Sequence, residues 1–210
     1  MFQDDPTFAL INFAIAGYLF YLWFGDFLHF KKTGEFRKGA LQGATTVSLK
    51  LVVSAMAIAI ALLVIHTFTE ISLGVENQQT KVSFWALFSW VGAAFVEELI
   101  FRGYLVVQNK GQCALICSIL FFSVVFALGH PFLWDYTVAD GASIFAGEWK
   151  WNFTLQAANS TLSILECSLL FYCLRFVPMN KNRSILPCVA AHCAYNVGVF
   201  ITKLAQGFVV

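Results

Sequence analysis

Charge is scarce in this sequence: only 12% of its 210 residues are Asp, Glu, Lys or Arg. Soluble domains carry about a quarter. The formal net charge is only +1 at pH 7, so nothing in the composition attracts a polyanion. These deficits argue against an ordinary soluble domain and against a nucleic-acid partner.

Familiar cofactor and nucleophile signatures are missing as well. The sequence has no Gly-rich phosphate loop, no HExxH, no C-x-x-C and no G-x-S-x-G. Nucleotide binding, the common zinc motifs and a serine nucleophile elbow therefore lack support. All six cysteines fall in or beside apolar runs, where we interpret them as small packing residues. We expect no bound cofactor.

Long apolar runs are what the sequence does contain. Hydrophobic residues make up 59% of the chain, and the mean hydropathy is +0.73. A helix needs about 20 apolar residues to cross a bilayer. Six runs qualify, at residues 8–30, 46–68, 83–107, 113–130, 153–177 and 185–210. They are continuous rather than alternating, which favours helices. We predict an all-α, polytopic transmembrane bundle of about six crossing helices, as one domain over residues 1–210.

Basic residues predict the orientation of this bundle. Six crossings place both termini on one side of the membrane. Most Lys and Arg outside the runs lie in the first, third and fifth connectors, namely Lys31, Lys32, Arg37, Lys38, Lys110, Lys181 and Arg183. The positive-inside rule places these connectors in the cytoplasm and both termini outside it.

Three polar clusters interrupt the apolar runs. They read Glu97-Glu98-x-x-x-Arg102, Phe126-x-x-x-His130 and His192-x-x-x-Asn196. Residues four apart share one face of a helix. Ionisable groups inside crossing helices are expensive and usually mark a functional site. We therefore expect the three clusters to converge on one wet pocket inside the bundle.

The residue types in these clusters suit hydrolysis of an amide. Arg102 can neutralise Glu98, whereas Glu97 points away from Arg102 and remains available as a general base. Imidazoles can orient a water, and an amide or imidazole N–H can stabilise an oxyanion. Two alternatives stay open: zinc held by Glu97, His130 and His192, and the proton relay of a small transporter.

Depth is a difficulty for this convergence. At 1.5 Å per residue, Glu97 lies about 15 Å and His192 about 10 Å from the cytoplasmic ends of their segments. These depths agree with a site that opens toward the cytoplasm. By the same rise, His130 lies about 26 Å along its segment. The fourth segment must therefore start at another level, tilt steeply or have other bounds. Glu166, in the middle of the fifth run, is expected to hydrogen-bond a neighbouring helix.

The order EExxxR, FxxxH, HxxxN on successive apolar runs resembles the CPBP family (CAAX protease and bacteriocin-processing). The resemblance covers about residues 84–200 and extends to Gly103 and Tyr104, whereas Pro131 departs from the family pattern. It implies a glutamic-type intramembrane endopeptidase. By this resemblance, Glu97 is the general base, and Glu98 supports that base and pairs with Arg102. His130 positions the water, and His192 and Asn196 bind the oxyanion.

The resemblance also implies where the protein is located and what it acts on. Bacterial members are linked to peptide maturation, bacteriocin self-immunity and signalling, and eukaryotic members trim prenylated tails. We expect a multi-pass protein of the bacterial cytoplasmic membrane whose partners are the lipid bilayer and a peptide or membrane-anchored protein substrate. A prenylated substrate is not expected for so small a member. A non-catalytic scaffold or regulator is the alternative, and the sequence leaves the oligomeric state open.

Overall fold

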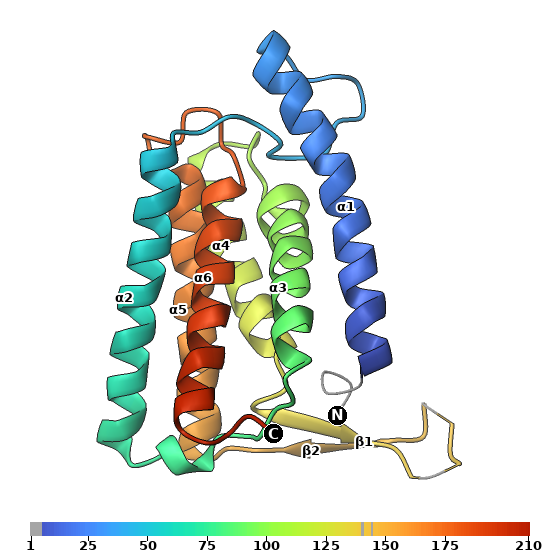
Figure 1. Ribbon diagram of the computed structural model, residues 1–210, viewed down its shortest axis with the longest axis vertical. Helices are drawn as coiled ribbons and strands as arrows, with labels where there is room; N and C mark the ends of the chain where they lie inside the picture. Colours follow the sequence, from blue (N-terminus) through green and yellow to red (C-terminus); the bar gives the residue numbers. More distant parts are fainter. Residues whose placement is uncertain (1–5, 140, 144) are drawn as a thin grey trace.

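The computed structural model describes residues 6–139, 141–143 and 145–210 as a bundle of roughly parallel helices (Figure 1). The helices are α1 (Pro6–Thr33), α2 (Leu49–Leu73), α3 (Ala86–Glu97), α4 (Gln112–Gly129), α5 (Leu155–Phe176) and α6 (Leu186–Ala205). All except α3 are long and apolar enough to cross a membrane. The predicted polytopic helix bundle is confirmed.

The third pass differs from the single α-helix predicted over residues 83–107. After Glu97, α3 continues directly into the π-helical segment η3 (Glu98–Leu105). The change of helix type therefore falls between the two adjacent carboxylates, and Arg102 also lies in η3. Short π-helical stretches are rare and are frequent at functional sites.

The order of packing places α6 near the centre of the bundle. It contacts α2, α3 and α5, while α1 packs on α3 and α4 packs on α5 (Figure 1). Small residues permit the close contact of α2 with α6: Ala55 and Ala59 are fully buried, and a Cβ on Gly198 would overlap Leu63. Close approach through small residues is a usual way of packing helices in lipid.

Local signals explain where several helices begin and end. The Ser48 hydroxyl accepts from the Leu51 N–H and so caps α2, and Thr154 caps α5 through the Ala157 N–H. Gly74 ends α2 with a φ of 68°, a left-handed conformation that glycine adopts without strain.

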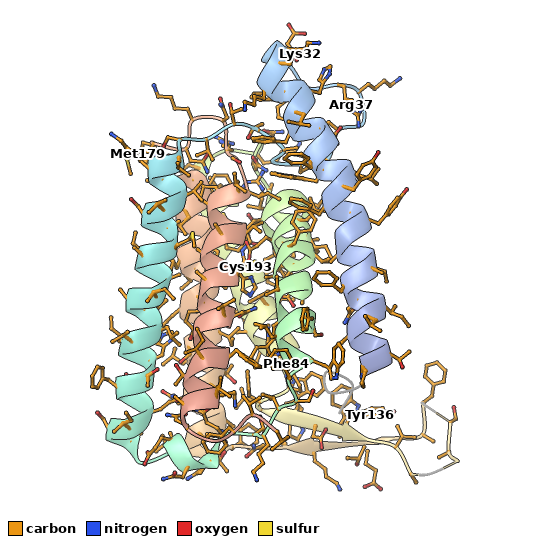
Figure 2. All side chains as sticks on the ribbon, in the orientation of Figure 1. Lys32, Arg37, Phe84, Tyr136, Met179 and Cys193 are labelled. Atoms are coloured by element: carbon orange, nitrogen blue, oxygen red, sulfur yellow. The ribbon has the colours of Figure 1, made fainter. Side chains whose placement is uncertain are left out.

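The first turn of α1 and the last turn of α6 lie at the same end of the bundle (Figure 1), as an even number of passes requires. At this end Val82 pairs with Val209, and its carbonyl accepts from the Val210 N–H at 3.0 Å. Lys32 and Arg37 lie at the opposite end (Figure 2). The basic connectors therefore share the end away from these helix termini.

A short turn and a β-hairpin were not predicted. The η2 turn (Glu76–Gln78) follows α2. Within the long connector after α4, β1 (Trp134–Thr137) pairs with β2 (Glu148–Trp151) as an antiparallel hairpin. The hairpin runs across the end of the bundle and projects beyond it (Figure 1).

Candidate active site

The first motif contains a buried ion pair. The side chains of Glu98 and Arg102 are both completely inaccessible, and Oε1 of Glu98 lies 3.1 Å from Nη1 of Arg102. The predicted neutralisation across one helical turn is therefore present. A buried charge without its partner is strongly destabilising, so this pair secures η3 in the bundle.

His192 joins the same carboxylate from α6. Its Nδ1 lies 2.9 Å from Oε1 of Glu98, and its ring stacks on Phe171 with a centroid separation of 4.8 Å. An ionised carboxylate can only accept a hydrogen bond, so Nδ1 of the neutral ring carries the hydrogen. The other ring nitrogen, Nε2, is then an acceptor, and it lies 3.8 Å from Oε2 of Glu97.

The two adjacent glutamates occupy different environments. The Glu98 side chain is inaccessible, whereas 31% of the Glu97 side-chain surface is exposed. One carboxylate is therefore fixed between a guanidinium and an imidazole, and the other is partly exposed beside the same imidazole. This division follows the expectation drawn from their positions on the helix.

Arg102 is held by groups to which the sequence reasoning gave no such role. Its Nη2 donates to Oγ of Ser168 at 2.8 Å and to the Ser168 carbonyl at 3.2 Å. Ser168 donates in turn to Ser123 at 3.1 Å. The rings of Phe126 and Tyr172 lie 4.6 Å and 4.8 Å from the guanidinium carbon. Hydroxyls inside apolar helices were the available signal, because such groups often bond across helices in membranes.

The second motif adjoins this network through Phe126. Its ring centroid lies 4.9 Å from that of His130 and 6.2 Å from that of His192. His130 directly follows α4, and its Nδ1 donates to the Phe126 carbonyl at 2.8 Å. The structure therefore brings His130 next to the shared site, with Phe126 as a packing residue between the two imidazoles.

The depth difficulty has a simple geometric answer. The Ser118 hydroxyl, in the second turn of α4, accepts from the Val107 N–H just beyond η3 at 3.1 Å. The first turn of α4 thus lies farther toward the basic end than the end of η3. This offset brings Phe126 level with Arg102, so the fourth segment starts at another level from the third.

Of the two polar residues of the third motif, only His192 contacts the other motifs as expected. His192 contacts both glutamates, but the Asn196 amide donates to the Trp90 carbonyl of α3 at 3.1 Å. Asn196 therefore fastens α6 to α3 two turns before Glu97. An oxyanion role for Asn196 would have to use its second amide hydrogen.

Zinc coordination was the alternative for Glu97, His130 and His192. Across residues 6–139, 141–143 and 145–210, no three His, Cys, Asp or Glu side chains are arranged to hold a metal ion. The Nδ1 atoms of both histidines are engaged by Phe126 and Glu98, so Nε2 is the ring nitrogen that each histidine has left for a water or another ligand.

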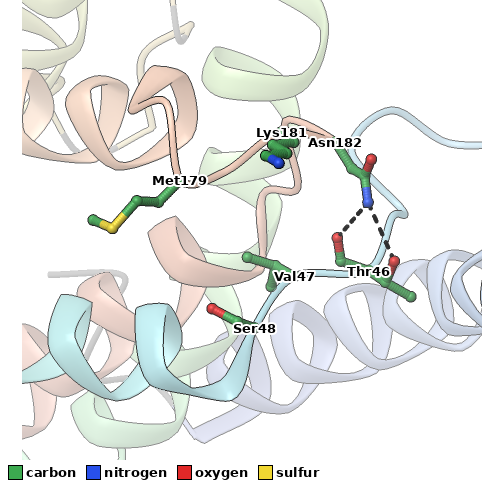
Figure 3. Close-up of a pocket in the computed structure, with 6 residues that line it drawn as sticks. All are labelled: Thr46, Val47, Ser48, Met179, Lys181 and Asn182. Atoms are coloured by element: carbon green, nitrogen blue, oxygen red, sulfur yellow. Dashed lines mark hydrogen bonds between the residues drawn. The ribbon is translucent and has the colours of Figure 1, made fainter.

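Two shallow, open cavities lie away from these motifs. One, of about 320 Å³, lies at the basic end (Figure 3) and is lined by Thr46, Val47, Ser48, Met179, Lys181 and Asn182. The other, of about 250 Å³, is lined by residues of α2 and by Thr202 of α6. Neither contains a motif residue. The catalytic candidates therefore rest on their chemistry and mutual geometry.

Comparison with protein families decides the relationship. A family model described as type II CAAX prenyl endopeptidase Rce1-like matches residues 79–198, more than half of the chain and all three motifs. The chain belongs to the Rce1-like family. No curated protein and no solved structure matches it. Membership confirms the resemblance seen in the motifs, and it makes this Rce1-like chain a multi-pass membrane protein with a protease function.

Proposed function

We propose that this Rce1-like chain is a glutamic-type intramembrane endopeptidase in which Glu97 activates a water. The substrate is a peptide or the tail of a membrane-anchored protein. The observation that carries the proposal is the separation of 3.8 Å between Oε2 of Glu97 and Nε2 of His192. Both atoms accept hydrogen bonds when the carboxylate is ionised and the ring is neutral.

Two hydrogen-bond acceptors at this distance, the Glu97 carboxylate and Nε2 of His192, can share one water molecule as their donor. A polar separation beyond 3.5 Å is commonly bridged by water, and a water has two hydrogens to offer. One hydrogen would point to Glu97 and the other to His192, which leaves an oxygen lone pair free for attack. His192 thereby takes the water-orienting role that the resemblance assigns to His130.

The fixed carboxylate supports this assignment. Glu98 accepts from Nδ1 of His192 and is itself held by Arg102. A carboxylate behind an imidazole fixes the tautomer and the orientation of the ring, as in other hydrolytic sites. Arg102 is anchored by Ser168. The chain from Ser168 to His192 therefore keeps Nε2 directed at the reacting water.

The reaction follows in two balanced steps. The water oxygen bonds to the amide carbon while Glu97 accepts the water proton, and the carbonyl electrons move onto oxygen. The second amide hydrogen of Asn196 is assigned to this oxyanion. The oxyanion then re-forms the carbonyl, the C–N bond breaks, and the leaving nitrogen takes the proton from Glu97.

Orientation and substrate class belong to the same proposal. The basic connectors, which lie at one end of the bundle, favour the cytoplasmic side of a bacterial inner membrane for that end. The family description names prenylated substrates, whereas the small size of the chain led us to expect unmodified ones. The two substrate classes can be separated by one assay.

The test compares variants of the full chain reconstituted in vesicles. Matched membrane peptides, with and without a prenyl group on a C-terminal tail, serve as substrates, and mass spectrometry detects the cleaved tail. We expect cleavage by the wild type and by Glu35→Gln, a control in the α1–α2 connector. Glu97→Gln and His192→Ala should abolish it while inserting and accumulating normally. Equal cleavage by Glu97→Gln and the wild type would overturn the assignment of the base.

Two further outcomes separate the alternatives. Loss of cleavage after chelation, restored by added zinc, would replace the glutamic mechanism by a metal-dependent one. If the wild type cleaves neither substrate while a cellular phenotype survives in both site variants, the chain acts as a scaffold. Each result is distinct from a failure to fold, which accumulation in the membrane monitors.

A further inference from the structure

The β1–β2 hairpin has one aromatic face and one polar face. Trp134 pairs with Trp151 and Tyr136 with Trp149, whereas Asp135 pairs with Lys150 and Thr137 with Glu148. Successive side chains of a strand point to opposite faces. The four aromatic rings therefore share one face, where the Trp134 and Trp149 rings lie 5.0 Å apart and those of Tyr136 and Trp149 4.9 Å apart.

The aromatic face is turned toward the helices. The Trp134 indole N–H donates to the Leu128 carbonyl in the last turn of α4 at 2.7 Å. Tyr136 lies on the side of the hairpin that faces the bundle (Figure 2). The charged partners Asp135 and Lys150 are consequently on the side that faces away from the bundle.

Much of this aromatic surface is not covered by protein. Trp149 is 60% exposed and Trp151 is 65% exposed, and the hairpin projects beyond the helices (Figure 1). The hairpin also lies at the level where spanning helices end, since β1 begins five residues after α4 ends. Tryptophan and tyrosine concentrate at this depth of a membrane, where their amphipathic rings sit among the headgroups.

We propose that the hairpin is an interfacial membrane anchor. Its aromatic face binds the phospholipid headgroup zone of the leaflet opposite the basic connectors, and its charged face remains in water. The choice of lipid follows from the separation of aromatic and charged side chains onto opposite faces of the hairpin and from its place at the helix ends. A water-soluble protein partner could reach little of the aromatic face, because that face is directed at the bundle.

The anchor also adjoins the second catalytic motif. The Phe132 ring, which precedes β1, stacks on the His130 ring with an interplanar angle of 5°. At the base of the hairpin, the Asn152 N–H that follows β2 donates to the Leu133 carbonyl that precedes β1 at 2.8 Å. Lipid binding by the hairpin therefore fixes the segment that follows His130. The anchoring proposal stands without the proposed peptidase activity.

Tryptophan fluorescence tests the proposal on the full chain in phosphatidylcholine vesicles. The wild-type spectrum minus that of Trp149→Phe/Trp151→Phe isolates the two hairpin indoles, and phenylalanine keeps the face apolar. We expect this difference emission to lose most of its intensity when the lipids are brominated near the headgroup end of the acyl chain. Aqueous iodide should leave most of it unquenched.

Two controls make the result decisive. The difference between wild type and Trp23→Phe reports an indole that is only 2% exposed, and it should respond to neither quencher. Lys150→Gln, on the polar face, should leave the lipid quenching of the hairpin unchanged. Quenching of the hairpin emission by iodide but not by brominated lipid would overturn the anchor and indicate a surface open to water.

Discussion

Nδ1 of His192 and Nη1 of Arg102 lie 2.9 Å and 3.1 Å from the same oxygen atom, Oε1 of Glu98. One inaccessible carboxylate thus connects the first motif to the third. Its neighbour Glu97 approaches only the far side of the same imidazole. In the mechanism that we propose, Glu98 therefore orients His192 and Glu97 transfers the proton, although the two residues have identical chemistry.

Replacing each glutamate by glutamine should separate these roles. Glu98→Gln leaves the Arg102 charge uncompensated inside the bundle, which typically costs about 3–5 kcal/mol. Glu97→Gln affects a partly exposed group and should change stability by less than about 0.5 kcal/mol. Thermal unfolding of the purified variants measures both effects. A stable Glu98→Gln variant beside an unstable Glu97→Gln variant would reverse the assignment.

Arg102→Lys tests the geometry of the guanidinium. Lysine keeps the charge but lacks the planar fork with which Arg102 reaches Glu98 and Ser168 together. We expect lower stability by about 1–3 kcal/mol, because a buried polar partner is left unpaired. Proteolytic turnover should fall mainly in kcat, since His192 loses its support. Arg37→Lys is the control, because the exposed Arg37 side chain pairs with the buried carboxylate of Asp26. An equally small effect at both positions would contradict the role given to the Arg102 guanidinium.

Ser168→Ala probes the support behind Arg102. The Ser168 hydroxyl accepts from Arg102 and donates to Ser123, and all three side chains are buried. Removing it leaves two buried polar groups short of a partner, with an expected loss of about 1–3 kcal/mol. Ser163→Ala, on the same helix and only partly buried, should have a smaller effect in the same unfolding assay. Equal losses of stability in the two variants would show that the Ser168 hydroxyl does not support Arg102.

The sequence was informative where interactions are local. The spacing of Glu98 and Arg102 predicted their ion pair because residues four apart on a helix are neighbours whatever surrounds them. The apolar runs predicted the six passes for a similar reason, since bilayer thickness fixes their length. The order of motifs along the chain also led to the correct family.

Contacts between helices were beyond such reasoning. Which of two adjacent carboxylates meets His192 depends on the rotation of α3 and α6, and the π-helical segment changes that rotation at Glu98. The offset of α4, on which the position of His130 depends, is fixed by the Ser118 contact with Val107. The bond from Asn196 to Trp90 and the hairpin likewise arise from tertiary packing, which overrides local pattern.

A second polar cluster should stabilise the bundle without taking part in turnover. His66 of α2 donates through Nε2 to Glu166 of α5 at 2.8 Å, and its Nδ1 accepts from the Tyr195 hydroxyl of α6 at 2.7 Å. The expected hydrogen bond between Glu166 and a neighbouring helix is thus confirmed. One imidazole joins three helices. Its bond to Tyr195 is buried, whereas the Glu166 side chain is 46% exposed. In His66→Ala the Tyr195 hydroxyl, which is 7% exposed, loses this partner.

We expect His66→Ala to lower the free energy of unfolding by about 1–3 kcal/mol, because the buried Tyr195 hydroxyl loses one of its hydrogen-bond partners. Tyr195→Phe leaves Nδ1 of His66 without its donor but keeps the bond from His66 to Glu166, so it should cost less than His66→Ala, which loses both bonds. Below the unfolding transition both variants should keep the kcat of the wild type, since neither residue contacts Glu97 in the network described above. His29→Ala, near the end of α1, controls for loss of an imidazole. A His66→Ala variant that unfolds normally but has lost turnover would place this cluster within the catalytic machinery instead.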